Sequence, residues 1–150
     1  MTIELRAILL AEDDVRDVEM TLLALKEHNL ANRVVVVRDG VEALDYLRCA
    51  GSHAGREPGL PAVLLLDVKM PRKNGLQVLR EIRADPGLKA LPVVMLTSSR
   101  EAPDLQAAYE LGANSYVVKP VGFEEFLGAV KQIGAFWGIL NEPAPEDGFV

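Results

Sequence analysis

Acidic side chains stand at the ends of two apolar runs of this chain. Asp67 directly follows the apolar residues 62–66, and Glu12 and Asp13 directly follow residues 7–11. Continuous apolar runs are typical of buried parallel strands, and open α/β sheets bind their ligands at the carboxyl ends of such strands. Carboxylates brought together there repel one another unless a cation joins them. Because oxygen ligands without histidine favour Mg²⁺, these three residues are candidate magnesium ligands.

Two further polar residues follow apolar runs in the same way. Thr97 comes directly after residues 92–96, and Lys119 comes directly after residues 115–118. A hydroxyl and an ammonium group beside a carboxylate and a metal site are what a phosphoryl group on Asp67 requires, because they provide donors for its oxygens. The pattern therefore indicates phosphoryl chemistry in which Asp67 is the acceptor.

The elements that must position these residues follow from the hydrophobic pattern. Apolar runs alternate with stretches of helical periodicity, which predicts an α/β fold. Right-handed crossovers favour a doubly wound, flavodoxin-like five-stranded parallel sheet in the order 2-1-3-4-5. In that order the first and third strands are neighbours, so Glu12 and Asp13 face Asp67. The predicted strands are residues 7–11, 34–37, 62–66, 92–96 and 115–118.

Helix ends and buried helix faces are also predicted. Capping-box spacings mark three helix starts, and Gly112 is expected to end the fourth helix in a left-handed conformation. The three pairs are Asp39 with Glu42, Asn74 with Gln77, and Ser98 with Glu101. The buried stripe of the first helix is expected to contain Val15, Val18, Leu22 and Leu25, and that of the fourth Leu105, Ala108, Tyr109 and Leu111.

Composition limits the possible functions. The chain has 150 residues, 49% of them hydrophobic, and a formal charge of -6, which suits one globular domain and disfavours a nucleic-acid-binding surface. The single cysteine, Cys49, excludes an intramolecular disulfide, and the two histidines are too few for a zinc site. The apolar stretch at the N-terminus is too short for a signal peptide or a membrane span. We expect a cytoplasmic protein that does not bind a membrane.

From residue 5 to about residue 138 the chain resembles the response-regulator receiver domains of two-component signalling. The motifs that carry the resemblance are residues 10–14, residues 65–71 with Asn74-Gly75, residues 96–98 and residues 116–120. The resemblance implies that Asp67 accepts a phosphoryl group from a sensor histidine kinase. It also implies that Asp13 binds Mg²⁺ directly, that Glu12 binds it through water, and that the Lys69 backbone carbonyl is a third ligand. Thr97 and Lys119 would hold the phosphoryl oxygens, and the Lys119–Pro120 peptide is expected to be cis.

The same resemblance implies how the signal leaves the site. In the family, a residue in the position of Thr97 moves toward the phosphoryl group and an aromatic residue in the position of Tyr116 turns inward. This movement biases the surface of the fourth helix, fifth strand and fifth helix between two states. Three features depart from the family pattern. Glu12 stands where Asp is commonest, Lys69 places a long cation beside the site, and Gly122 stands where a capping side chain is usual.

A narrower resemblance is to the single-domain regulators associated with bacterial phytochromes. It rests on the loop at residues 49–61, on Lys73 and on Phe136-Trp137. Such relatives often dimerise through their C-terminal part, for which Phe136, Trp137 and Leu140 are the candidate interface residues, although Trp137 could instead cover the core. We expect a receiver domain at residues 1–140 and an acidic, proline-containing tail at 141–150. Its partners would be a sensor kinase and a downstream protein or phosphotransfer partner.

Three alternative functions can be compared with the sequence. A flavodoxin-like cofactor-binding or nucleotide-binding domain would need a glycine-rich phosphate loop, and the turn after the first strand contains acids instead. An aspartate-nucleophile phosphatase would have a second aspartate two residues after the first, where this chain has Lys69. A receiver-like module that works without phosphorylation would not need the acid pair, Thr97 and Lys119.

Overall fold

The computed structural model describes residues 6–26, 32–98 and 102–132. Five parallel strands form one sheet in the order β2-β1-β3-β4-β5, as predicted. The order reverses between β1 and β3, where Ala11 pairs with Leu66, so the acids that follow these residues lie side by side. The strands are β1 (Ile8–Ala11), β2 (Val34–Val37), β3 (Val63–Asp67), β4 (Val93–Thr97) and β5 (Ser115–Val118).

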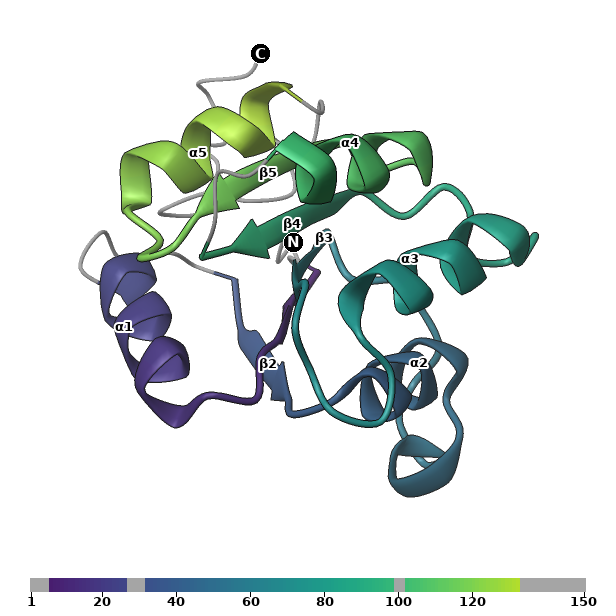
Figure 1. Ribbon diagram of the computed structural model, residues 1–150. Helices are drawn as coiled ribbons and strands as arrows, with labels where there is room; N and C mark the ends of the chain where they lie inside the picture. Colours follow the sequence, from purple (N-terminus) through teal and green to yellow (C-terminus); the bar gives the residue numbers. More distant parts are fainter. Residues whose placement is uncertain (1–5, 27–31, 99–101, 133–150) are drawn as a thin grey trace, which may run out of the picture.

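Helices cover both faces of the sheet (Figure 1). One core cluster lies between the sheet and the helices α2, α3 and α4, and the other lies between the sheet and the helices α1 and α5. Phe126 of α5 is completely buried in the second cluster. The helices are α1 (Val15–Lys26), α2 (Gly40–Arg48), α3 (Gly75–Ala84), α4 (Ala102–Glu110) and α5 (Phe123–Gln132). Within the described residues, no helix is long and apolar enough to cross a membrane.

Strands β3 and β4 extend one residue beyond the apolar runs that predicted them. Asp67 is the last residue of β3 and Thr97 is the last residue of β4, and these two strands pair in register up to the pair Asp67 and Leu96. The ladder of hydrogen bonds therefore fixes the backbone of both functional candidates. This gives the site a rigid base, since residues in a paired strand have little freedom to move.

Two helix faces differ from the predicted stripes. In α1, Val18 and Leu25 are buried as predicted, but Val15 is 54% exposed and Thr21, which was not predicted, is buried. Val15 is the first residue of α1, and neither core cluster includes it. In α4, Ala108 is buried as predicted, whereas Tyr109 is 48% exposed. The predicted burial of Leu105 concerns a side chain outside the described part of the structure.

The predicted caps are present with one difference. Asn74 and Gln77 form a complete capping box at α3, and the Asp39 carboxylate accepts the Glu42 amide at 2.8 Å. The Glu42 carboxylate, however, accepts the amide of Arg38 at 2.9 Å and not that of Asp39, so only half of the predicted box forms at α2. Gly112 has a φ of 99°, which confirms a left-handed end after α4. The predicted cap at Ser98 and Glu101 extends outside the described residues.

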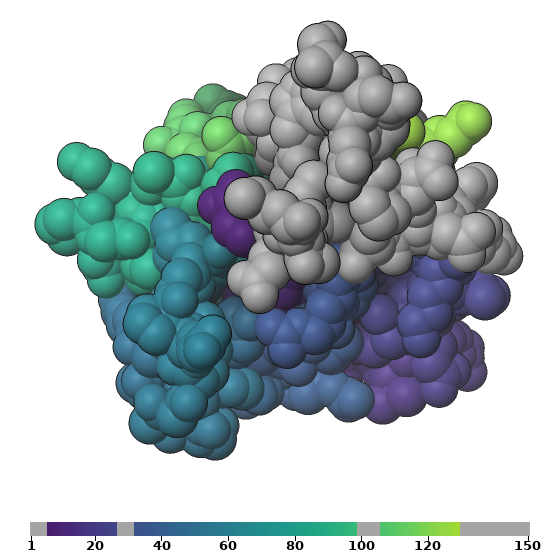
Figure 2. All heavy atoms as spheres, turned by 180° about the vertical axis from the view of Figure 1, so that it is seen from behind, coloured from purple at the N-terminus to yellow at the C-terminus, as the bar shows by residue number. Residues whose placement is uncertain are grey.

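The segment at residues 49–61 is a loop with one short 3₁₀ turn, Gly51–His53. It is tied to α2 by contacts that the sequence did not indicate. The His53 ring nitrogen lies 3.0 Å from the Glu42 carboxylate, and the Arg56 guanidinium stacks 4.1 Å from the centre of the Tyr46 ring. Figure 2, from behind, shows this part of the chain as a protrusion at the lower left. The loop therefore has a defined shape on the surface of α2.

Candidate functional site

The predicted site residues converge at the carboxyl ends of four strands. Asp67 ends β3, Thr97 ends β4, Glu12 and Asp13 follow β1, and Lys119 follows β5. Glu12 is 1% exposed, Asp67 and Thr97 are each 4% exposed, and Asp13 is exposed. Because these strands are adjacent in the sheet, residues separated by up to about a hundred positions become neighbours. The switch point between β1 and β3 is where doubly wound sheets place their ligands.

The carboxylates of Glu12, Asp13 and Asp67 are arranged like metal ligands. One oxygen from each residue can be chosen so that all three atoms lie within 4.8 Å of one another. All are hard oxygen donors, and among the described residues no histidine or cysteine joins the cluster, which suits an alkaline-earth or similar divalent cation. The residues therefore fit a divalent metal. Lys69, predicted to contribute its backbone carbonyl, lies two residues after Asp67 with an exposed side chain.

Lys119 neutralises part of this acidic cluster. Its Nζ lies 3.0 Å from Glu12 Oε1, 3.4 Å from Asp67 Oδ2 and 2.8 Å from Asp17 Oδ2. Burial alone would lower the pKa of Lys119, but its hydrogen bonds to Asp17 and Glu12 and the charge of Asp67 outweigh burial and raise it. Lys119 is therefore a fixed cation beside the candidate acceptor.

Asp17, on the first turn of α1, is a residue of this site that the sequence did not reveal. It lies on a helix with several other charged residues, and nothing local distinguishes it from them. Its partner Lys119 is 102 positions away, so only the tertiary structure brings the pair together.

The pKa of Glu12 indicates that the cluster lacks positive charge. Burial, together with its contact to the Asp67 carboxyl, raises the pKa of Glu12 from 4.5 to about 7, while Lys119 acts in the opposite direction. A carboxyl group with such a pKa is held near other acids without enough compensation. A divalent cation bound between these oxygens would supply the missing charge and lower that pKa. The shortage of positive charge and the arrangement of the three carboxylates therefore both favour a divalent cation at this site.

The backbone beside Lys119 is also as predicted. The Lys119–Pro120 peptide bond is cis, and the Lys119 amide donates to the Thr97 carbonyl at 2.8 Å. This hydrogen bond continues the contact between β4 and β5 one residue past the β5 strand. Helix α5 then begins after Gly122, whose carbonyl accepts the Phe126 amide at 3.0 Å without a capping side chain of its own.

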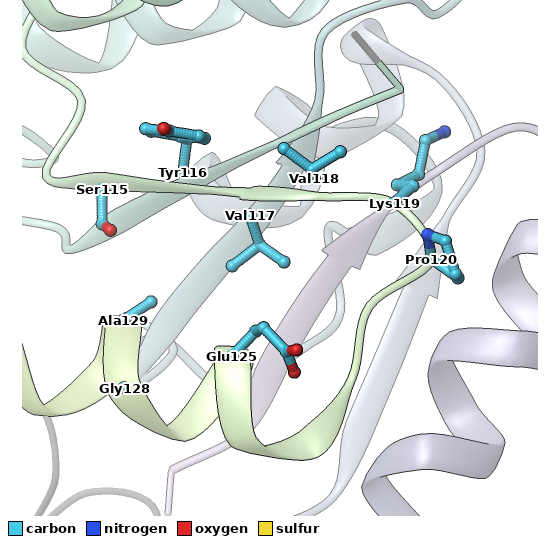
Figure 3. A pocket seen from close by; sticks show the side chains of 9 residues that line it. All are labelled: Ser115, Tyr116, Val117, Val118, Lys119, Pro120, Glu125, Gly128 and Ala129. Atoms are coloured by element: carbon cyan, nitrogen blue, oxygen red, sulfur yellow. The ribbon is translucent and has the colours of Figure 1, made fainter. Parts of the chain in front are cut away.

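Tyr116 lies on the edge strand β5 and points outward. It is 37% exposed, and its ring meets the ring of Tyr109 edge-on, with 6.0 Å between the centroids and an angle of 81° between the planes. Figure 3 shows Tyr116 and Val118 on the side of β5 that faces away from α5, with Ser115 and Val117 on the other side. Tyr109, predicted as a core residue, is therefore an exposed partner of the predicted switch residue.

A hollow of about 510 Å³ lies along β5 and α5. Its lining runs from Ser115 to Pro120 and includes Glu125, Gly128 and Ala129, as Figure 3 shows. Lys119 lines this hollow and also contacts Glu12 of the acidic cluster, so the hollow lies next to the cluster. The predicted interface residues Phe136, Trp137 and Leu140 lie outside the described part of the chain.

Comparison with known proteins gives the same fold. Residues 8–131 match the model of the response regulator receiver domain. The structure of the bacteriophytochrome response regulator AtBRR is 56% identical with a TM-score of 0.86, covering 93% of this chain and 100% of that one. The bacteriophytochrome response regulator RtBRR is 53% identical with a TM-score of 0.84, covering 97% and 88%.

A curated relative, the response regulator Rcp1 of Synechocystis sp., is 35% identical over 132 residues, 88% of each chain. A crystal structure of Rcp1 in an Mn²⁺-bound form has a TM-score of 0.71 to this chain. The chain belongs to the response regulator receiver domain family, which confirms the resemblance found in the sequence. It is a signalling protein close to phytochrome response regulators, and phosphorylation on an aspartate is typical of its family.

Proposed function

We propose that Asp67 accepts a phosphoryl group from a phosphohistidine of a sensor histidine kinase, in a reaction that depends on Mg²⁺. The observation that carries this proposal is the convergence of three carboxylates within 4.8 Å, with Lys119 Nζ 3.4 Å from Asp67. Asp67 is the member of the cluster that ends a central strand, between neighbours on both sides. A phosphorylation-independent module would gain nothing from burying these charges together.

In the proposed step, a carboxylate oxygen of Asp67 attacks the phosphorus atom. The new O–P bond forms as the N–P bond of phosphohistidine breaks, and the electron pair of that bond returns to the imidazole, which takes a proton from solvent. The product is an acyl phosphate on Asp67. Lys119, already beside Asp67, can donate to one phosphoryl oxygen, and the Thr97 hydroxyl at the neighbouring strand end can donate to another.

Asp13, Asp67 and the backbone carbonyl of Lys69 would hold the Mg²⁺ ion directly, and Glu12 would hold it through water. When bound, Mg²⁺ supplies positive charge next to the transferring phosphoryl oxygens. Mg²⁺ is the proposed ion because it uses one or two carboxylates and keeps several waters and phosphate oxygens as its other ligands. The existence of an Mn²⁺-bound form of the relative Rcp1 supports the binding of a divalent cation.

The output surface we propose is the face of α4, β5 and α5. Thr97 would move toward the phosphoryl group, and Tyr116 would leave its edge contact with Tyr109 and turn inward, which changes the shape of this face. The hollow beside Lys119 lies on the same face and would be the part nearest to the phosphoryl group. A downstream protein or a second phosphotransfer partner would read this surface.

The similarity to AtBRR, RtBRR and Rcp1 supports a bacterial phytochrome as the sensor kinase. We further propose a homodimer in which Phe136, Trp137 and Leu140 form the apolar anchors. We assign residues 1–140 to the receiver domain and residues 141–150 to its tail. A cytoplasmic location follows from the proposed kinase reaction, because histidine kinases take their phosphoryl groups from cytoplasmic ATP.

The test is phosphoryl incorporation with Mg²⁺ and radiolabelled acetyl phosphate. We expect one label per chain in the wild type. No label should be incorporated when Mg²⁺ is chelated before the reaction, and none should be incorporated in Asp67→Asn. The matched control is Asp85→Asn, which changes an acid at the end of α3 and should leave labelling intact. Label that persists in Asp67→Asn, or a wild-type chain that takes no label from either acetyl phosphate or a phosphorylated kinase, would overturn the proposal.

A further inference from the structure

The loop that follows Asp67 contains an unusual turn at Arg72. Arg72 has a φ of 65°, a left-handed conformation that a bulky residue rarely adopts. The Lys73 amide donates to the Pro71 carbonyl at 2.8 Å, so the chain closes a three-residue turn around Arg72. A γ-turn with positive φ is rare and strained. Such a conformation persists only where the surrounding structure holds it.

What holds Arg72 is a fork of two contacts to Asp39. Arg72 Nε lies 3.1 Å from Asp39 Oδ2, and a terminal nitrogen of the same guanidinium donates to Asp39 Oδ1 at 3.1 Å. This bidentate geometry fixes direction as well as distance. The Asp39 carboxylate is itself immobile, because it caps α2 by accepting the Glu42 amide at 2.8 Å. The contact thus joins the loop after β3 to the turn after β2.

Close backbone packing accompanies the fork. A Cβ placed on Gly40, the first residue of α2, would lie 2.2 Å from the Lys73 carbonyl oxygen, so glycine is required for this approach. The Lys73 side chain pairs with Glu81 of α3. The second half of the loop is therefore attached to both α2 and α3.

The first half of the loop is anchored to the sheet and to the core. The Val68 amide donates to the Leu96 carbonyl at 3.1 Å, and the Gly75 amide donates to the Val68 carbonyl at 2.8 Å. Met70 is buried in the core cluster beneath α2 and α3. Lys69, between Val68 and Met70, is the exposed residue whose backbone carbonyl is the proposed metal ligand. Its position depends on anchors on both sides.

We propose that the Arg72–Asp39 clamp positions the loop that carries the Lys69 carbonyl and so sets the affinity of the acidic site for its divalent cation. This inference rests on the proposed function, since it concerns the same metal site. Arg72 and Asp39 are positioning residues, because among the described residues their side chains contact each other and the start of α2 and not the proposed metal ligands. An exposed ion pair contributes little to stability, and the Arg72 side chain is 57% exposed, so its main effect is on geometry.

The test is titration with Mg²⁺ by calorimetry, without a phosphoryl donor. Arg72→Asn removes the fork but retains a residue that tolerates positive φ. Asp39→Asn removes the charge but keeps a side-chain oxygen for the Glu42 amide. We expect each to weaken Mg²⁺ binding roughly 10-fold, the lower part of the range for residues that support metal ligands. The double variant should be no weaker than either single variant, because both remove the same interaction.

The matched control is Arg48→Gln. Arg48 pairs with Glu81 and Asp85 between α2 and α3, but it does not contact the loop. This variant should bind Mg²⁺ as the wild type does. Arg72→Asn and Asp39→Asn proteins that melt cooperatively and bind Mg²⁺ with wild-type affinity would overturn the clamp.

Labelling by acetyl phosphate gives a second readout. In the clamp variants the rate should fall at Mg²⁺ concentrations below saturation and return to the wild-type rate at saturation. A rate that stays low at saturating Mg²⁺ would contradict a role in metal affinity. A wild-type protein that is not labelled at all would overturn the function of Asp67, whereas the titration would still decide the clamp.

Discussion

Two networks of charged side chains in this domain use the same kinds of residue in different surroundings. At the strand ends, Lys119 is 11% exposed and contacts Glu12 and Asp67, which are 1% and 5% exposed. Between α2, α3 and the loop after β3, the side chains of Arg48, Arg72, Lys73, Asp39, Glu81 and Asp85 are 19% to 57% exposed. Water screens the second network and hardly reaches the first.

The difference indicates two roles for charge. Buried charges stay out of water at a large desolvation penalty, so each depends on its partners and responds strongly when a cation or phosphoryl group arrives. The raised pKa of Glu12 is a sign of that dependence. Exposed pairs are worth little energy, but a fork such as Arg72 on Asp39 can still fix the direction of a loop. In our proposals, the first network performs the chemistry and the second holds its geometry.

Removal of Lys119 should have the largest effect. Lys119→Met leaves Glu12 and Asp67 buried without their cation, and we expect the free energy of unfolding to fall by about 3 kcal/mol, as when one partner of a buried pair is removed. Urea denaturation with chelator measures this. The control is Lys89→Met, at an exposed position, which should change stability little. Equal losses of stability in Lys119→Met and Lys89→Met would show that the buried surroundings of Lys119 do not increase the cost of removing it.

Packing in the second network should matter more than its charges. Gly40→Ala places a Cβ against the Lys73 carbonyl, and we expect a loss of about 2 kcal/mol from overpacking, despite the better helix propensity of alanine. Gly128→Ala in α5 is the matched control, because none of the described residues lies within 4 Å of its added Cβ. That control should gain up to about 1 kcal/mol. A stabilised Gly40→Ala protein would contradict the close approach.

Mg²⁺ should stabilise the protein through the buried network at the strand ends and not through the exposed network. For a Kd of about 1 mM, about 10 mM Mg²⁺ raises the free energy of unfolding by about 1.4 kcal/mol. Thermal melts with and without Mg²⁺ measure the shift, and Asp13→Asn should reduce it, while Asp85→Asn, in the exposed network but away from the loop after β3, should leave it unchanged. A melting temperature indifferent to Mg²⁺ in the wild type would count against the acidic cluster as a metal site.

The Lys73–Glu81 pair should have the smallest effect. Its hydrogen bond from Lys73 lowers the pKa of Glu81 below the ordinary value of 4.5. The pair therefore stabilises the fold at pH above that value, and the contribution is lost as the pH falls through the lowered pKa. Because both side chains are about one-third exposed, we expect less than about 1 kcal/mol.

A double-mutant cycle of Lys73→Met and Glu81→Gln at pH 7 measures this coupling. The coupling should decrease at high salt and disappear in acid. A coupling above about 2 kcal/mol that resists salt would place this pair with the buried network instead.

Much of the fold could be predicted because its signals are local. The apolar runs located all five strands to within one residue, and the pair Asn74 and Gln77 marked the start of α3 correctly. Local patterns failed where the surroundings decide burial. Val15 and Tyr109 have the helical spacing of core residues, but no core cluster includes Val15 and Tyr109 meets the exposed ring of Tyr116.

By itself the sequence determined which residues stand at strand ends, and hence that Glu12, Asp13, Asp67, Thr97 and Lys119 share one site. Strand order follows from connection rules, so this needed no coordinates. Only the tertiary structure decided the contact of Asp17 with Lys119 and the clamp of Arg72 on Asp39. Each of these contacts joins residues on separate elements, and a charged residue on a helix or loop looks the same in sequence whether or not a distant partner meets it.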